Sequence, residues 1–399
     1  MRPYGGTSRA RACTCGWIGE SPRPVSWYYR NWIRPLLFLQ DSERVHNRTL
    51  QGLAWMSASR ELCSAMAGWF NTPGLPVEAF GLRFPNPVGL AAGMDKGAVA
   101  VPAWESMGFG FSELGGVTRH GQSGNPEPRM FRAPAEEALL NRMGFNNPGA
   151  DILAERLARW HARGRWPSHP VGVNLGKSKV TPLGEAASDY AYSFRKLWGL
   201  ADFFVVNVSS PNTPNLRQLQ DKSALDEILA ALQEVNAAEQ RMAGGGARLK
   251  PILVKVAPDL TWDALDDVVS LVAPRALAGL VATNTTIARP PTEDPVARWV
   301  YRETGGLSGR PVRERSTEVI RHLYRQTAGR VPIIGVGGIS TVDDAWEKVL
   351  AGATLLQVYS GLVYEGPSLP SARVTGLRER LAGAAWSDVV GSGAGVAKN

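Results

Sequence analysis

Eight short apolar runs alternate with amphipathic stretches along most of the chain, and this alternation constrains the fold more than any other feature. Each run has the length of a buried parallel strand, and each intervening stretch has room for a helix. The runs lie at about residues 87–92, 110–117, 170–175, 202–208, 251–257, 279–283, 331–336 and 354–359. Eight strand–helix units predict an α/β fold, the (β/α)8 TIM barrel.

The main alternative to a barrel is an open, doubly wound sheet. Such a sheet needs a glycine-rich dinucleotide loop after its first strand, and the segment Ala91-Ala92-Gly93-Met94-Asp95-Lys96-Gly97 does not have that pattern. The length of 399 residues also fits one barrel of about 250 residues with appendages.

Residues 27–72 differ in composition from the barrel region. Tryptophan and leucine recur there at broadly helical spacing, which predicts two or more short helices. These helices could keep apolar surface for a membrane or partner, or pack on the barrel as a cap, and the two interpretations are compatible. We therefore expect four parts: a disordered extension (1–26), a helical segment that could contact a membrane (27–72), the barrel (73–385) and a flexible tail (386–399).

The net charge of +8 is concentrated near the N-terminus, where residues 1–40 hold six arginines and one glutamate. A basic segment beside exposed aromatic residues suits an anionic membrane surface, and a solvated arm is the alternative. Nucleic acid is not expected as a partner. No apolar stretch reaches the roughly 18 residues of a membrane span, so any membrane contact is predicted to be peripheral.

The three cysteines, Cys13, Cys15 and Cys63, support neither a disulfide framework nor a four-ligand metal site. No metal is expected, and a reducing cytoplasm fits this cysteine usage. The first residues faintly resemble a mitochondrial transit peptide, but without a convincing amphipathic helix they are better interpreted as a bacterial extension.

Polar residues follow most of the predicted strands. A single asparagine at a strand end is usually a turn former. Several strand-end amides that converge on one barrel mouth suggest instead a neutral, planar ligand with amide donors and acceptors. The amides and hydroxyls concerned are Asn174, Asn207, Asn212, Asn284 and Thr285.

A second group of residues predicts a phosphate-bearing cofactor. The backbone of Gly337-Gly338 and of Ser360-Gly361 lies where barrels bind phosphate. Lys255 stands in an otherwise apolar strand, where its charge needs a partner such as a reduced flavin ring. A structural ion pair inside the barrel is the alternative for Lys255. Without a dinucleotide loop, flavin mononucleotide (FMN) is the best candidate.

The segment Val205–Arg217, with Ser209-Ser210-Pro211-Asn212-Thr213 after a buried strand, closely resembles the active-site loop of the class 2, membrane-associated dihydroorotate dehydrogenases. Ser210 stands where class 1 enzymes carry cysteine. The resemblance extends from Trp27 to about Pro370. It implies FMN positions at Ala92, Gly93, Lys96, Gly116, Asn141, Asn174, Asn207, Lys255, Thr283, Ser308, Gly309, Gly337, Gly338, Tyr359 and Ser360.

The same resemblance implies the substrate positions and two departures from the family pattern. Lys96, Asn141, Asn207, Asn212, Asn284 and Thr285 correspond to residues around orotate. Gly116 replaces a serine or threonine of many relatives, and Val117-Thr118-Arg119-His120 departs from a common Thr-Pro.

By the resemblance, Ser210 is the catalytic base, with Thr213 and Phe145 beside its proton relay and the loop 211–220 as a lid. Ser209 is the adjacent alternative, although neighbouring side chains point apart. A quinone tunnel is implied at His46, Arg132 and Tyr359, where His46 could equally be an ordinary helix histidine.

The resemblance implies an FMN-dependent enzyme that oxidises (S)-dihydroorotate to orotate in pyrimidine biosynthesis and reduces a membrane quinone, with residues 27–72 as the segment through which the quinone enters. The expected location is the cytoplasmic side of the bacterial inner membrane. Two alternatives stay open: a related flavin barrel that acts on another pyrimidine, and an inactive, membrane-docked protein that keeps the cofactor.

Overall fold

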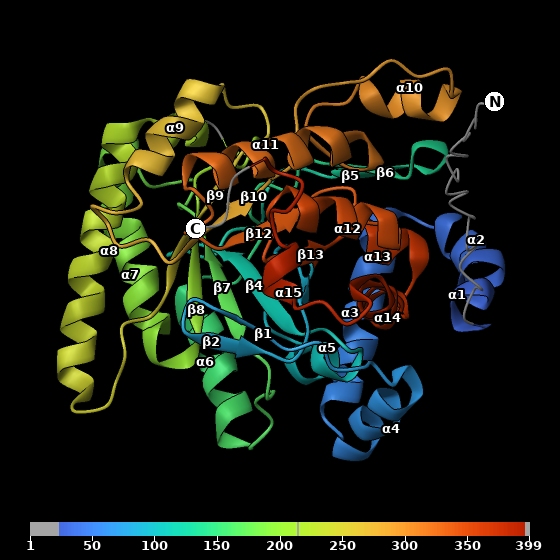
Figure 1. Ribbon diagram of the computed structural model, residues 1–399, viewed down its shortest axis with the longest axis horizontal. Helices are drawn as coiled ribbons and strands as arrows, with labels where there is room; N and C mark the ends of the chain where they lie inside the picture. Colours follow the sequence, from blue (N-terminus) through green and yellow to red (C-terminus); the bar gives the residue numbers. More distant parts are fainter. Residues whose placement is uncertain (1–23, 214, 396–399) are drawn as a thin grey trace, which may run out of the picture.

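The computed structural model describes residues 24–213 and 215–395, and its centre is a closed barrel of eight parallel strands (Figure 1). Each barrel strand is hydrogen-bonded to the next, and the last pairs with the first. All eight predicted runs are confirmed as barrel strands. They are β3 (Val88–Leu90), β4 (Phe111–Val117), β7 (Val171–Leu175), β8 (Phe203–Asn207), β9 (Ile252–Val256), β10 (Gly279–Ala282), β12 (Ile333–Val336) and β13 (Leu355–Val358).

Helices connect successive strands around the outside of the barrel (Figure 1). Their starts follow from local chemistry: at α12, for example, Thr341 and Asp344 form a reciprocal capping box. The helices are α5 (Val101–Ser106), α6 (Ala150–Ala162), α7 (Ala186–Leu197), α8 (Lys222–Ala243), α9 (Trp262–Ser270), α11 (Arg313–Gln326), α12 (Val342–Ala351), α13 (Ser360–Glu365) and α14 (Leu369–Leu381).

A hairpin of β1 (Val77–Ala79) and β2 (Leu82–Phe84) closes the amino end of the barrel. The ring of Phe84 packs edge-on against Phe111, the first residue of β4, at 5.4 Å between centroids. Phe111 in turn packs against Phe203, the first residue of β8. Because aromatic rings fill this end, only the carboxyl end of the strands is left for a site.

Four α-helices precede the barrel: α1 (Pro24–Tyr28), α2 (Arg34–Phe38), α3 (Ser42–Ser57) and α4 (Arg60–Phe70). A π-helical turn, Tyr29–Ile33, joins α1 to α2. The side chains of Asp41 and Ser59 cap α3 and α4, each by accepting a hydrogen bond from a backbone N–H three residues later. Of the predicted extension 1–26, residues 1–23 lie outside the described residues.

A small antiparallel sheet lies apart from the barrel strands, in the order β11-β6-β5. It consists of β5 (Met130–Ala133), β6 (Ala138–Asn141) and β11 (Gly306–Gly309), and α10 (Pro295–Tyr301) packs beside it. The sequence analysis assigned Asn141, Ser308 and Gly309 to the site without recognising this sheet.

The expectation of a flexible tail over residues 386–399 is wrong for residues 386–395. Trp386 begins the short helix α15 (Trp386–Val389), is buried, and donates its indole N–H to the carbonyl of Thr354 at 3.0 Å. Further on, Arg325 Nε donates to the carbonyl of Ala394. Small residues allow this segment to pack closely, since a Cβ added to Gly391 would lie 2.0 Å from the ring of Tyr324. Residues 396–399 lie outside the described residues.

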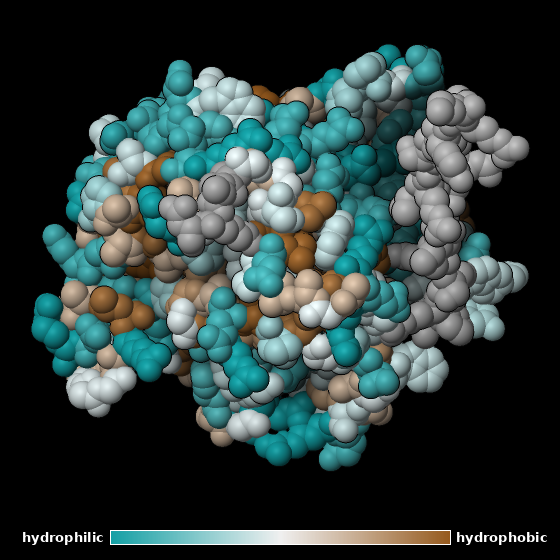
Figure 2. Space-filling model, in the orientation of Figure 1, coloured by the Kyte–Doolittle hydropathy of each residue, from teal (hydrophilic) through white to brown (hydrophobic). Residues whose placement is uncertain are grey.

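Within the described ranges no helix combines the length and apolar character needed to cross a bilayer. Those ranges also contain no group of three His, Cys, Asp or Glu side chains arranged to hold a metal ion. Cys63 is a buried free thiol, whereas Cys13 and Cys15 lie outside the described residues. The face in Figure 2 carries hydrophilic residues interspersed with separate apolar patches.

Candidate active site

A cavity lies at the carboxyl end of the barrel strands, and residues from all eight strand ends line it together with the small antiparallel sheet. Ser210 and Phe145 are part of the lining, whereas Thr213 is buried on the loop of Ser210 without lining the cavity. The structure brings together every predicted cofactor and substrate position: Ala92, Gly93, Lys96, Gly116, Asn141, Asn174, Asn207, Asn212, Lys255, Thr283, Asn284, Thr285, Ser308, Gly309, Gly337, Gly338, Tyr359 and Ser360.

Three asparagine amides form a hydrogen-bonded ladder across the cavity. Asn207 Nδ2 donates to Asn174 Oδ1 at 2.9 Å, and Asn284 Nδ2 donates to Asn207 Oδ1 at 3.2 Å. Ser209 completes the ladder, because its hydroxyl donates to Asn207 Oδ1 and accepts from Asn284 Nδ2. Each amide is thus oriented by its neighbour, so the ladder presents a rigid polar wall to a ligand.

Sequence reasoning missed a buried carboxylate next to this ladder. Glu113, in the middle of β4, is fully buried and accepts hydrogen bonds from Asn174 Nδ2 at 2.6 Å and from Gln357 Nε2. Burial lowers the pKa of Lys255, and the Glu113 charge opposes that effect. The described residues contain no ion pair between Lys255 and this carboxylate, and the Lys255 side chain lines the cavity. The available signal was a glutamate inside the apolar run 110–117.

Lys96 follows β3 and lines the cavity from a turn that Asp95 holds in place. The buried Asp95 carboxylate accepts hydrogen bonds from the backbone N–H groups of Val99 and Ala100, both at 2.9 Å, and from the Trp104 indole. Burial lowers the pKa of Lys96 to about 8. Lys96 therefore still carries its charge at neutral pH and can bind an anionic group.

Ser210 and Ser209 have different surroundings. Ser210 is 8% exposed and lines the cavity, and its Oγ accepts a hydrogen bond from the backbone N–H of Asn212 at 3.3 Å. Ser209 is fully buried, and its hydroxyl is engaged in the amide ladder. Of the two candidates, Ser210 is therefore the one that a ligand in the cavity can reach.

Close contact with the ring of Phe145 explains why position 116 is a glycine in this chain. A Cβ added to Gly116 would lie 2.6 Å from the ring of Phe145, a contact that real Cβ atoms essentially never make. Phe145 has a positive φ of 52°, which turns its ring toward this strand end and toward Gly176. The departure from the serine or threonine of many relatives thus leaves space for Phe145.

In the part of the cavity next to the loops after β12 and β13, neighbouring segments lie too close to the backbone of two glycines for any residue with a Cβ. At Gly338, where φ is +67°, a Cβ would lie 2.6 Å from Arg313 Cβ. At Gly361 a Cβ would lie 2.1 Å from the carbonyl oxygen of Ile339. The hydroxyls of Ser308 and Ser360 are hydrogen-bonded at 2.9 Å beside these glycines. Such a cradle of backbone and hydroxyl groups suits a phosphate.

A second cavity, of about 720 Å³, lies between the N-terminal helices and the barrel. Most of its lining is apolar, and it includes the three predicted tunnel residues His46, Arg132 and Tyr359. Tyr359 lines both cavities, as do Met130 and Leu139. The two cavities therefore meet at these three side chains.

Hydrogen bonds fix the position of one of the three predicted tunnel residues, and burial sets the protonation states of the other two. Arg132 donates to the backbone carbonyls of Leu37 and Gln40, and its guanidinium lies over the Phe38 ring at 4.5 Å. Burial and the nearby Lys96 charge lower the pKa of His46 to about 4, so its imidazole is neutral at physiological pH. Burial raises the pKa of Tyr359 to about 12.

Comparisons with known proteins agree with this architecture. Residues 74–381 match the family model described as dihydroorotate dehydrogenase. The dihydroorotate dehydrogenase (quinone) of Gloeobacter violaceus is 54% identical over 354 residues, which cover 87% of this chain and 93% of the relative. The protein of that name from Chloroflexus aurantiacus is 52% identical, with coverage of 87% and 95%.

Solved structures give the same result. The Eimeria tenella DHODH in complex with ferulenol superposes with a TM-score of 0.77 at 36% identity, and the match covers 88% of this chain and 95% of that one. On the family model and these relatives, the chain belongs to the dihydroorotate dehydrogenase family.

Proposed function

We propose that this protein oxidises (S)-dihydroorotate to orotate in de novo pyrimidine (UMP) biosynthesis and passes the electrons to a membrane quinone. The observation that carries the proposal is the contact between two unlike cavities at Met130, Leu139 and Tyr359: the first is lined by many amide, hydroxyl and lysine side chains, and the second is almost wholly apolar. A redox cofactor at this junction is accessible to a polar substrate on one side and to an apolar acceptor on the other.

The polar cavity fits a flavin, and its phosphate cradle favours FMN. Three buried polar atoms have no hydrogen-bond partner within the described part of the chain and belong to lining residues: Asn212 Oδ1, Thr285 Oγ1 and Gln357 Oε1. Buried polar groups without partners are costly, so these atoms indicate a ligand. The glycine backbone of 337–338 and the Ser308 and Ser360 hydroxyls would hold the phosphate. When bound, the flavin accepts hydride from the substrate and later gives two electrons to quinone.

The substrate would lie against the amide wall and Lys96. Dihydroorotate is an anion with ring N–H and carbonyl groups. The Lys96 ammonium supplies the positive charge, and the amides of Asn141, Asn207, Asn212 and Asn284 with the Thr285 hydroxyl supply directional partners. Asn212 Nδ2 also donates to Asn141 Oδ1 at 3.0 Å, which joins the Ser210 loop to the small sheet.

Ser210 would take the proton from C5 of dihydroorotate while hydride leaves C6. A serine hydroxyl is a poor base at its ordinary pKa, so it needs a site with little water and a route for its own proton. Ser210 is almost fully buried, and the Thr213 hydroxyl on the same loop is buried without a partner among the described residues. Thr213 is therefore available for a relay, and the Phe145 ring would shield it.

The apolar cavity would admit the quinone, with His46, Arg132 and Tyr359 as its polar contacts. Around it, the N-terminal helices expose large apolar side chains, including Trp32 (63%), Leu36 (65%) and Leu39 (85%). Two arginines of this region have partners within the protein: Arg30 forms an ion pair with Glu365, and Arg34 donates a hydrogen bond to the carbonyl of Tyr364. Peripheral binding to the cytoplasmic side of a bacterial inner membrane would therefore depend chiefly on apolar side chains.

Anaerobic half-reactions test this function. The purified protein should be yellow and release one FMN per chain on denaturation. Dihydroorotate should bleach the flavin in a single turnover, and a short-chain quinone should restore the colour. A flavin that dihydroorotate does not reduce would refute the proposal.

A further inference from the structure

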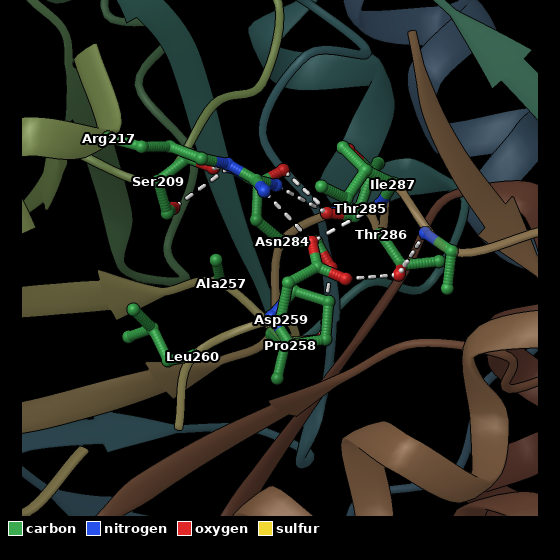
Figure 3. A network of polar contacts seen from close by, with 12 residues as sticks. Ser209, Arg217, Ala257, Pro258, Asp259, Leu260, Asn284, Thr285, Thr286 and Ile287 are labelled. Carbon is green, nitrogen blue, oxygen red and sulfur yellow. Dashed lines mark hydrogen bonds and ion pairs between the residues drawn. The ribbon is translucent and has the colours of Figure 1, made fainter. Parts of the chain in front are cut away.

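A charged pair outside both cavities joins the loop of Ser210 to two neighbouring loops (Figure 3). Arg217 belongs to the 3-10 turn Leu216–Gln220, which follows β8, and Asp259 follows β9. Arg217 Nη1 and Asp259 Oδ2 are 3.0 Å apart. Their side chains are 24% and 18% exposed, so the pair is partly shielded from water.

The rest of the Arg217 guanidinium is aimed at the backbone of the site. Its Nε donates to the carbonyl of Ser209 at 3.2 Å, and its Nη2 donates to the carbonyl of Thr285 at 3.3 Å. The Ser209 carbonyl belongs to the peptide group that leads directly into Ser210. Thr285 belongs to the lining on the predicted substrate side. One rigid, planar group thus fixes the spacing between the Ser210 backbone and the substrate wall.

Asp259 is itself fixed in place. Its carboxylate accepts hydrogen bonds from the backbone N–H of Ile287 at 3.1 Å and from the Thr286 hydroxyl, both on the loop after β10 (Figure 3). The residues on either side of Asp259 are held from α11, because Arg315 donates to the carbonyls of Pro258 and Leu260 at 2.9 and 3.0 Å. Asp259 is therefore held in place by the loop after β10 and by α11, and it in turn holds the Arg217 guanidinium.

We propose that Arg217 and Asp259 are positioning residues that set the distance between the Ser210 hydroxyl and the bound substrate. This inference rests on the proposed function. Neither side chain lines the cavity, so neither touches substrate or cofactor. Their effect is on geometry: an error of about 1 Å in the placement of a reacting group can cost about 100-fold in rate.

The test compares Arg217→Gln, Arg217→Lys and Asp259→Asn in the flavin-loaded enzyme. Arg275→Gln is the control, because Arg275 also pairs with an aspartate, Asp226, but this pair is more exposed (32% and 36%) and joins α8 to the segment after α9, not to the loop of Ser210. Stopped-flow absorbance measures flavin reduction at saturating dihydroorotate, and reoxidation by quinone is measured separately. Flavin content and the urea midpoint report stability.

Arg217→Gln should slow the limiting rate of flavin reduction by about 10- to 100-fold. Reoxidation by quinone, flavin content and the urea midpoint should stay at the values of the Arg275→Gln control. Arg217→Lys should keep the positive charge but lose the planar guanidinium. The rate of flavin reduction should therefore lie between those of Arg217→Gln and the wild type. The double variant Arg217→Gln/Asp259→Asn should be no slower than Arg217→Gln alone, because both residues belong to one unit.

Reduction of Arg217→Gln at the wild-type rate, or an equal loss in both half-reactions, would overturn the inference. If Arg217→Gln does not fold, Arg217→Lys and Asp259→Asn replace it in the test. Flavin reduction at the wild-type rate in both of these variants would overturn the inference. Wild-type flavin that dihydroorotate does not bleach would instead refute the proposed function.

Discussion

A buried ion pair between Glu43 and Arg129 connects α3 to the segment that leads from β4 into the small antiparallel sheet, and its removal gives the most quantitative prediction about stability. Arg129 Nη2 and Nε donate to both oxygens of Glu43 at 2.6–3.1 Å. The other terminal nitrogen of Arg129 donates to the carbonyls of Ser123 and Asn125. The two side chains are 9% and 10% exposed, so water can replace these contacts only poorly.

Arg129→Met should leave the Glu43 carboxylate buried without its partner. Loss of one partner of a buried pair costs about 3–5 kcal/mol, and the lost bonds to the two carbonyls make the upper part of that range the better expectation. Glu43→Gln keeps the shape and an acceptor, so it should cost only about 1.5–3 kcal/mol, the value of a hydrogen bond to a charged group. The double variant Glu43→Leu/Arg129→Met should be more stable than Arg129→Met alone, because no unpaired charge remains buried.

Urea unfolding measures the free energy of unfolding of each variant. It is carried out at saturating FMN, so that bound cofactor contributes equally to the stability of all variants. The exposed pair of Arg275 and Asp226 provides the control, and Arg275→Met should cost no more than about 1 kcal/mol. Arg129→Met with a cost as small as that of Arg275→Met would refute the reasoning. A double variant that is as unstable as the sum of its single variants would do the same.

Four further outcomes are expected. Ser210→Ala should bind FMN and orotate normally but slow flavin reduction by about two to four orders of magnitude, and an unchanged stopped-flow rate would contradict its role as base. Gly338→Ala should lower the FMN content of the purified protein, since its Cβ would meet Arg313 at 2.6 Å, and full occupancy would argue against the cradle. The folded-state pKa of His46, about 4, is below the ordinary value of 6.5. Between these pH values only the unfolded state binds the proton, so stability should fall as pH drops through this window, and less so in His46→Phe. Deletion of residues 1–70 should abolish quinone reduction and lipid association while dihydroorotate still bleaches the flavin; a truncated enzyme with full quinone activity would make these helices only a cap.

Much of the fold and of the candidate site could be predicted from the sequence, because a barrel ties position in the chain to position in space. Every strand in a (β/α)8 barrel runs the same way, so all strand ends meet at one mouth. The residues at or just after the ends of the eight apolar runs, such as Lys96, Asn174 and Ser210, were therefore expected to converge once the eight strand–helix units were recognised. The Val205–Arg217 motif then distinguished between the possible chemistries.

The remaining features depend on contacts between distant segments, for which the sequence carries no local pattern. Glu43 and Arg129 are 86 residues apart, and Arg217 reaches Thr285 across 68 residues. The partner of a charged side chain is decided by which loops the closed barrel brings together. The hydrogen bond from Trp386 to the carbonyl of Thr354, just before β13, could not be predicted for the same reason. The sequence by itself determined the strand count and the residue types at the mouth, whereas only the tertiary structure decided their partners, because pairing depends on distance in space.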